Sequence, residues 1–273
     1  MKVYIQTDIE GIAGFVFFEN GKEPGAENLA HRIRMRELLT AEVNAAVKAS
    51  FKAGAREVVV NDSHGSGYNI IFEKLDPRCE IVHGRNCSGP HWLPEFGPGF
   101  DALVLVGQHA MGGTKGAILA HSLWRVNNGE IFLGEGSMAA AIAGDYNVPT
   151  VFVSGDDYIT AEMREKIPSI QTVQVKKALG TYIARSLIPS RACEMIFEGV
   201  KNALRRADKV QPYVIKGPVS LNLLEGPHHG LPFKQVLKKD IKNDTISGAF
   251  STAVKNFPWN NFDVQLPDGF SYP

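Results

Sequence analysis

Two carboxylates, Asp8 and Glu10, follow the first strong hydrophobic run of the chain, and Gly11 comes directly after them. Residues two apart in an extended segment point the same way, so both carboxylates are expected to face one point. Two acids in a partly buried crevice repel each other unless they share a proton or bind a cation between them. A single acid after a strand more often caps the next segment. The pair alone therefore leaves capping, a shared proton and a bound cation open.

Two histidines occupy similar positions farther along the chain. His64 ends the sequence NDSH after the hydrophobic run at 58–60, and His109 lies in GQHA after the run at 103–106. Taken singly, each histidine is more often held by loop hydrogen bonds than by a metal. Neutral imidazole nitrogens bind zinc and similar divalent ions, however, so two histidines arriving beside two acids favour the cation.

Further acidic residues belong to the same candidate set. Glu135 stands between glycines in GEG, just before a predicted helix, and is a candidate fifth donor for a site with two metals. Its alternative role is to favour the helix dipole, an effect of about 0.3–1 kcal/mol. Asp156 and Asp157 follow the hydrophobic run at 151–153. Because the carboxyl ends of parallel strands share one edge, we expect the groups after all four runs to converge there.

One more histidine differs from the rest. His121 in LAHS follows a short apolar run and lies twelve residues after His109. It is expected either to enter the crevice without being a ligand or to be a buried histidine bonded to the backbone. No role is assigned to the remaining loop histidines: His83, His91, His228 and His229.

Four hydrophobic runs predict the strands that position these residues. They lie at 3–5, 58–60, 103–106 and 151–153, and each is continuous rather than alternating, which is typical of strands buried on both faces of a parallel sheet. A helical pattern over 27–54 separates the first two and ends at Gly54. Its predicted apolar face consists of Ile33, Leu38, Val43, Val47 and Phe51. Further helices are predicted at 137–146 and 160–167.

The pattern changes beyond residue 170, with strand candidates at 172–179 and 218–225 and a helix at 191–209. We therefore predict an α/β fold with a mainly parallel sheet flanked by helices. The metal-binding catalytic domain is expected at 1–170, and a smaller α+β portion at 171–273 is expected to complete the subunit and supply oligomer contacts. The position of this boundary is approximate, because no linker rich in Ser or Pro marks it. The aromatic and proline-rich ending, 256–273, is expected to pack on the body or on a neighbouring subunit.

Composition limits the classes of partner. The 29 basic residues balance 29 acidic ones, so nothing in the net charge favours binding to nucleic acid or to an anionic membrane. Three cysteines, Cys79, Cys87 and Cys193, form no C-x-x-C pair and fit a reducing compartment. No apolar run approaches the roughly 18 residues of a membrane span. We expect a cytoplasmic protein with a small-molecule or peptide site.

Other reaction types lack their signatures in the sequence. The nearest approach to the G-x-S-x-G pattern of serine hydrolases is NDSHG around Ser63, which lacks the first glycine. The loop GGTKG does not have the G-K-[ST] order of a phosphate-binding loop. H-E-x-x-H is absent, which excludes the common helical zinc-protease motif but leaves other zinc enzymes open.

Six short motifs together resemble the zinc-dependent D-aminopeptidases of the DppA type. They are TDIEG at 7–11, VNDSHG at 60–65, GQHA at 107–110, AHS at 120–122, GEGSMAA at 134–140 and SGDD at 154–157, in the family's order. One motif alone is a weak signal, whereas six in sequence are specific. The segment between His121 and Glu135 is shorter here than in a family member with the same motifs, so we expect a pocket of different shape.

The resemblance implies a role for each motif residue. Asp8 would bridge two zinc ions, Glu10 and His64 would complete one site, and His109 and Glu135 would complete the other. His121 would be the catalytic histidine outside the metal shell. The resemblance also implies a ring-shaped homo-oligomer that encloses its active sites.

The expected function is that of a dinuclear zinc aminopeptidase. It would remove the N-terminal residue from short peptides or amino-acid amides, with a preference for D residues, by using a hydroxide held on the metals. Metal binding lowers the pKa of water from about 15.7 toward about 7, which supplies this nucleophile at neutral pH. Two alternatives stay open: a metal-dependent amidohydrolase or deacylase acting on a small molecule, and a non-catalytic metal-dependent binding module.

Overall fold

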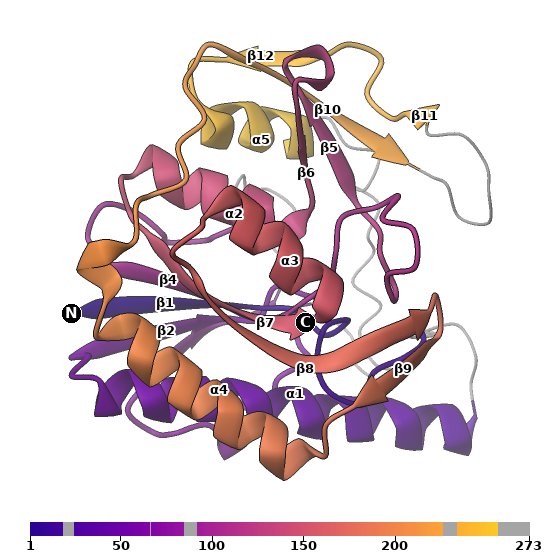
Figure 1. Cartoon of the computed structure of the whole chain (residues 1–273), viewed down its shortest axis with the longest axis vertical. Helices are drawn as coiled ribbons and strands as arrows, with labels where there is room; N and C mark the ends of the chain where they lie inside the picture. Colours follow the sequence, from indigo (N-terminus) through magenta and orange to yellow (C-terminus); the bar gives the residue numbers. More distant parts are fainter. Residues whose placement is uncertain (19–24, 66, 85–91, 226–233, 256–273) are drawn as a thin grey trace, which may run out of the picture.

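The computed structural model describes residues 1–18, 25–65, 67–84, 92–225 and 234–255. Figure 1 shows a central twisted sheet with helices on both faces and a second, smaller sheet stacked beyond one of these helical layers. The predicted ending at 256–273, together with Cys87, His91, His228 and His229, lies outside the described residues. Hydrophobic side chains between the central sheet and its helices form the main core.

The central sheet has seven strands in the order β3-β2-β1-β4-β7-β8-β9. All neighbouring pairs are parallel except the antiparallel β8–β9 hairpin. The four continuous hydrophobic runs form β1, β2, β4 and β7 and are buried, which confirms the predicted parallel sheet. The strand bounds are β1 Lys2–Thr7, β2 Glu57–Asn61, β3 Glu80–Val82, β4 Ala102–Gln108, β7 Thr150–Asp156, β8 Gln171–Gly180 and β9 Ile183–Ser186.

The strand order reverses at β1. The chain passes from β1 to β2 on one side of it, and β4 later pairs with β1 on the other side. The loops that leave the carboxyl ends of β1 and β4 therefore start side by side at this point. Ligands of open α/β sheets bind outside the carboxyl ends of the strands where the order reverses, so the residues that follow these two strands are the candidate site.

Helices α1 (Ala26–Lys52) and α4 (Pro189–Leu204) cover one face of the central sheet, and α2 (Glu135–Asp145) and α3 (Asp157–Lys166) cover the other (Figure 1). All four were predicted, with different ends. Val43 and Val47 are buried in α1, as expected, whereas Ile33 is 47% exposed because the first half of α1 extends past the sheet. Helix α2 begins at Glu135 itself rather than after it.

The second sheet has the order β11-β10-β5-β6, and β12 pairs with β10. Because β10 lies antiparallel to β5, the sheet combines segments from both sides of residue 170. The proposed domain boundary there stays a prediction. The bounds are β5 Leu123–Val126, β6 Ile131–Leu133, β10 Val219–Glu225, β11 Lys234–Gln235, β12 Ile241–Asn243 and α5 Ile246–Lys255, with short 3-10 turns at Phe72–Lys74, Asn127–Gly129 and Ala207–Lys209.

The structure bears on two sequence expectations, the state of the cysteines and the absence of membrane-spanning segments. Cys79 and Cys193 are free thiols. Within the described part of the chain, no helix has both the length and the apolar character needed to cross a bilayer. The cytoplasmic location stays a prediction.

Candidate metal centre

The first donor group lies at the carboxyl ends of β1 and β2. Asp8 and Glu10 follow β1 and are almost fully buried, and His64 arrives from the loop after β2. His64 Nε2 lies 3.1 Å from Glu10 Oε1. One ligand atom from each of these three residues lies within 4.8 Å of the others. This spacing allows one ion to contact all three side chains.

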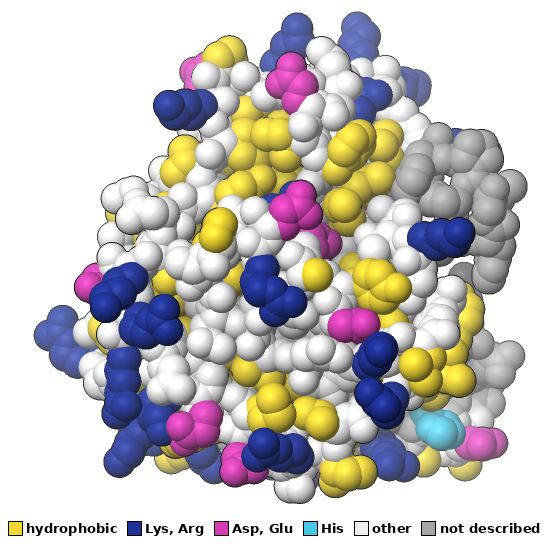
Figure 2. Space-filling model, in the orientation of Figure 1, with side chains coloured by type: hydrophobic (Ala, Val, Ile, Leu, Met, Phe, Trp, Pro, Cys, Tyr) yellow, Lys and Arg dark blue, Asp and Glu magenta, His cyan; other side chains and the backbone are white. Residues whose placement is uncertain are grey.

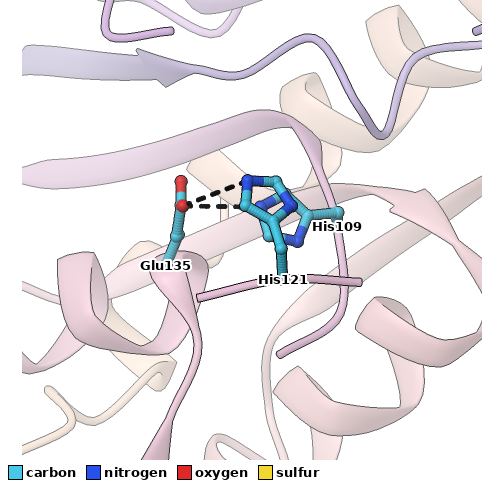
Figure 3. A group of neighbouring side chains, drawn as sticks. All are labelled: His109, His121 and Glu135. Carbon is cyan, nitrogen blue, oxygen red and sulfur yellow. Dashed lines mark ion pairs between the residues drawn. The ribbon is translucent and has the colours of Figure 1, made fainter. Parts of the chain in front are cut away.

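The second donor group comes from the loop after β4 and from the two ends of the β5–β6 hairpin. His109 Nε2 and His121 Nε2 lie 3.7 and 3.6 Å from the same oxygen, Glu135 Oε1. Figure 3 shows the two imidazoles stacked with the carboxylate facing both, and their ring centres are 3.9 Å apart. This group too has ligand atoms within 4.8 Å of one another.

Asp8 joins the two groups. Its Oδ2 atom lies 3.5 Å from His109 Nε2, across the boundary between the neighbouring strands β1 and β4. The five residues expected to bind metal are thereby brought together in one buried cluster at the point where the strand order reverses. His121 lies within this cluster rather than apart from it.

Two glycines allow the backbones that carry these donors to approach each other. Gly11 donates its N–H to the Gly107 carbonyl at 2.7 Å. A Cβ atom on Gly11 would lie 2.0 Å from the Gln108 carbonyl oxygen, and one on Gly107 would lie 2.2 Å from the Asp8 carbonyl oxygen. Gly107 also has a φ of +74°, which side chains disfavour. The glycines in TDIEG and GQHA are therefore required for close packing of the two loops.

The orientation of the imidazoles leaves one nitrogen of each ring facing the carboxylates. His109 Nδ1 bonds to the Ala110 carbonyl and His121 Nδ1 bonds to the Leu119 carbonyl, both at 2.8 Å. A carbonyl accepts a hydrogen bond, so it selects the tautomer in which Nδ1 carries the proton and Nε2 offers a lone pair. Metal-binding histidines are commonly fixed in this way.

Several buried polar atoms of the cluster lack hydrogen-bond partners. Among the described residues, Asp8 Oδ2, Glu10 Oε2 and His109 Nε2 are buried and accept or donate no hydrogen bond. Buried polar atoms are normally satisfied, because leaving one unpaired costs about 1–3 kcal/mol. Carboxylate oxygens and imidazole nitrogens left in this way suit a divalent cation, so the donor set fits a metal centre.

Ionisation of the cluster follows from burial and from neighbouring charges. Burial, aided by the negative charges of Glu10 and Glu135, raises the pKa of Asp8 well above its ordinary value. Burial opposes ionisation of Glu135 too, but the contact with His109 and the charge of that ring outweigh it and lower the pKa to about 2. Burial acts to lower the pKa of His109, yet its contact with Glu135 raises it to about 9. Burial lowers the pKa of His121, and the charge of His109 adds to this effect.

The sequence did not single out three residues that support the cluster. Ser122 Oγ donates a 2.6 Å hydrogen bond to Glu135 Oε1. Glu162 on α3 accepts hydrogen bonds from Met111 N and from Ser137 Oγ and so fixes the loop after His109 to the start of α2. Lys176, on β8, is buried against the Glu10 loop. Of these three residues, only Ser122 belongs to one of the six motifs of the sequence analysis, AHS at 120–122.

The aspartates of the SGDD motif do not join the cluster, contrary to expectation. Asp156 accepts a hydrogen bond from Ile159 N and caps α3, and Asp157 accepts one from Ala178 N on β8. Both carboxylates are therefore used to begin a helix and to hold a strand. His83 packs against the rings of Tyr68 and Phe72 and is in neither donor group.

Comparison with known proteins places the chain beside peptidases. A family model described as D-aminopeptidase matches residues 1–225. The D-aminopeptidase of Bacillus subtilis (strain 168) is 32% identical over 223 residues, which span 78% of this chain and 77% of that protein. The solved structure of the Zn-dependent D-aminopeptidase DppA from Bacillus subtilis, described as a self-compartmentalizing protease, is similar with a TM-score of 0.80 and 26% identity, covering 93% of this chain and 96% of that one.

Proposed function

The chain belongs to the D-aminopeptidase family, and from this premise we propose that it is a zinc aminopeptidase that releases the N-terminal residue of short peptides or amino-acid amides, with a preference for D residues. One observation carries the proposal: carboxylate and imidazole donors from five separate positions meet at the point where the strand order reverses. A binding module without catalysis has no comparable need for His121, which lies in the same cluster with its Nε2 directed at Glu135.

Two zinc ions are proposed, with Asp8 shared between them. Glu10 and His64 complete one site, and His109 and Glu135 complete the other. The 3.5 Å contact between Asp8 and His109 supports the shared role, because it puts Asp8 in reach of both donor groups. When bound, zinc lowers the pKa of a water molecule and polarises the carbonyl of the bond to be cut.

His121 is the proposed proton carrier. Its side chain is 25% exposed, whereas that of His109 is fully buried, so His121 is the imidazole that a substrate can approach. The Leu119 carbonyl holds the proton on Nδ1, and the lowered pKa keeps the ring neutral near pH 7. A neutral Nε2 accepts a proton as the nucleophile is formed and returns it to the departing amine.

Aromatic side chains line the approach to His121. The ring of Phe18 packs edge-on against the imidazole with ring centres 5.3 Å apart, and Tyr182 packs against Phe18 with ring centres 6.4 Å apart. Apolar rings beside a proton-transfer group exclude water and offer a surface for an apolar substrate side chain. We therefore propose that the N-terminal side chain of the substrate contacts Phe18.

We also propose that the chain assembles into a closed, ring-shaped homo-oligomer. The similar structure from Bacillus subtilis is described as self-compartmentalizing. In this chain, the β8–β9 hairpin carries three exposed apolar residues, Leu179, Tyr182 and Ile183, of which the first and last are nearly 60% exposed. Figure 2 shows hydrophobic side chains over this hairpin at the right of the view. Large exposed apolar residues close together are typical of a surface that another subunit covers.

The test compares metal content with hydrolysis. Purified protein is expected to contain zinc and to release ammonia from D-alanine amide faster than from L-alanine amide. A chelator should abolish the activity and zinc should restore it, and Asp8→Ala should lose both metal and activity. Absence of bound metal, together with no response to added zinc, would contradict the proposal. Activity confined to acylated amines would instead identify a deacylase.

A further inference from the structure

A lysine side chain is buried directly behind the metal centre. Lys176 is 1% exposed, although it lies in the middle of β8, whose neighbours Gln174 and Lys177 are exposed. Regular alternation along the strand would place Lys176 on the same side as Gln174. A register shift in the pairing with β7, where Gly155 pairs with Gln174 and Asp156 with Lys176, turns the side chain inward. Such bulges commonly redirect a side chain near an active site.

The ammonium of Lys176 contacts both ends of the segment that carries Glu10. Its Nζ atom donates hydrogen bonds to the carbonyl oxygens of Glu10 and Phe15, the latter at 2.7 Å. Between these two points, Ala13 N donates to Glu42 Oε1 at 2.8 Å. The loop after β1 is thus held from β8 and from α1 by two buried polar side chains, Lys176 and Glu42.

Burying the Lys176 ammonium costs free energy that an apolar side chain at the same position would not cost. A buried charge loses its hydration, and replacing buried ionic groups by apolar ones of similar volume is often neutral or stabilising. The described bonds of Lys176 are to main-chain carbonyls, so they fix the position of the backbone rather than neutralise one carboxylate. The same positive charge also lies near the acidic groups Asp8, Glu10, Glu42 and Asp156. The hydrogen bonds to the backbone and the positive charge of Lys176 therefore both act on Glu10, which is proposed to hold one of the zinc ions.

We propose that Lys176 is a positioning residue, which fixes the main chain of the loop at 10–15 and thereby directs the Glu10 carboxylate toward the metal. The inference rests on the proposed function, since it assumes that Glu10 binds zinc. Partners of metal ligands typically change metal affinity by about 10- to 100-fold when they are removed. An effect of this size is expected here at the zinc site that contains Glu10.

The test uses Lys176→Met, which keeps an unbranched apolar stem of nearly the same length but removes the ammonium. Its matched control is Asn222→Leu on β10, which removes a buried side chain that bonds to the Leu237 carbonyl and to Asp240 at the far sheet. Zinc affinity is measured by competition with a chromogenic chelator, and the visible spectrum of the cobalt-substituted protein reports ligand geometry. Lys176→Met should weaken one of the two zinc sites by about 10-fold or more and alter the spectrum, while the control changes neither.

Two outcomes separate this inference from the function on which it rests. If the parent protein binds no zinc, the proposed function fails. If the parent protein binds zinc and Lys176→Met, folded and less stable, binds it equally well with an unchanged spectrum, Lys176 serves only the core and the inference is wrong. Should Lys176→Met not fold, Lys176→Gln carries the same test, because its amide is polar but uncharged and ends one atom short of the position of the lysine Nζ. Hydrogen exchange of the amides at 11–15 should then rise selectively in Lys176→Gln.

Discussion

At the scale of single residues, the cluster is built from groups whose ionisation depends on one another. Asp8 and Glu135 are both buried carboxylates, yet their pKa values are shifted in opposite directions because only Glu135 lies against both imidazoles. The imidazoles differ in the same way, with the pKa of His109 raised and that of His121 lowered. Because the pKa values of Asp8 and His109 are raised, a metal ion that binds them must displace the protons they hold.

Zinc binding is expected to release protons near neutral pH. In the metal-free protein His109 has a pKa of about 9 and is protonated below that pH, but only the neutral ring binds a metal. Affinity should therefore rise with pH until about pH 9 and fall as pH is lowered. Titration calorimetry at about pH 7.5, in buffers with different heats of ionisation, should detect release of the His109 proton, together with any proton that Asp8 retains because its pKa is raised as well.

The control for this measurement is His121→Ala. The pKa of His121 is lowered, so its ring is already neutral and contributes no released proton. The variant should release as many protons as the parent protein. Equal heats in all buffers for the parent protein would show that no proton is exchanged and would contradict the assignment of His109.

His121→Ala should also separate catalysis from metal binding. If His121 carries protons and the five other residues hold the zinc ions, the variant keeps its metal and loses kcat by about 100-fold or more. The measurement is zinc content beside steady-state kinetics on D-alanine amide, with His83→Ala as a control outside the cluster. Loss of one zinc ion from His121→Ala would make His121 a ligand, as its position in the second donor group allows.

At the scale of elements, the site depends on how closely two strand ends approach. The carboxyl ends of β1 and β4 are joined by hydrogen bonds from Asp8 N to the Val106 carbonyl and from Gly11 N to the Gly107 carbonyl. Because the nearest atoms are backbone atoms, rotating a neighbouring side chain cannot remove the steric clash that a larger residue at Gly11 would cause. The geometry of the metal centre is therefore set by main-chain packing as much as by the ligands.

Gly11→Ala should destabilise the protein strongly. The added methyl would lie 2.0 Å from the Gln108 carbonyl oxygen, so the loops must separate. We expect a loss of ~3 kcal/mol or more in the free energy of unfolding, which is at the upper end for overpacked cores, together with weaker zinc binding. Urea denaturation measures the first effect. Gly99→Ala is the control, since its Cβ would meet nothing within 4 Å, and an equal loss in both variants would refute the packing argument.

The sequence predicted those elements whose signal is local. Continuous β-branched runs identified β1, β2, β4 and β7, and the residues that follow three of them supply Asp8, Glu10, His64 and His109 to the cluster. It did not predict that Lys176 points inward, because a register shift between β7 and β8 breaks the alternation on which such reasoning depends. It also misplaced Asp156 and Asp157, since capping a helix and binding a metal need the same residue types.

At the scale of the whole molecule, the arrangement depends on contacts distant in sequence. Strand β10 pairs with β5, with Leu221 opposite Val126, and this pairing joins the last third of the chain to the hairpin between His121 and Glu135. Local patterns carry no information about such partners, so of the second sheet only β10 was predicted, as the strand candidate at 218–225. The β8–β9 hairpin forms the edge of the central sheet opposite β3, and it exposes the apolar side chains of Leu179 and Ile183.

The double substitution Leu179→Asp and Ile183→Asp should dissociate the proposed oligomer. Both side chains are nearly 60% exposed in the single subunit, so the charges cost little there, whereas burial against a second subunit would be strongly unfavourable. Light scattering coupled to size exclusion should show a smaller species with an unchanged circular dichroism spectrum. Val214→Asp, at another exposed apolar residue, is the control. A parent protein that is already monomeric contradicts the assembly, and an unchanged oligomer moves the interface elsewhere.

The β5–β6 hairpin ties the positions of His121 and Glu135 to each other. Its strands pair as Trp124 with Leu133 and Val126 with Ile131, so its base returns His121 and Glu135 to the same point whatever lies at the tip. Residues added in pairs at the tip, Asn127–Gly129, lengthen both strands equally and leave the base in place. A pair of residues inserted at this tip is therefore expected to leave the spacing of His121 and Glu135, and with it the metal centre, unaltered.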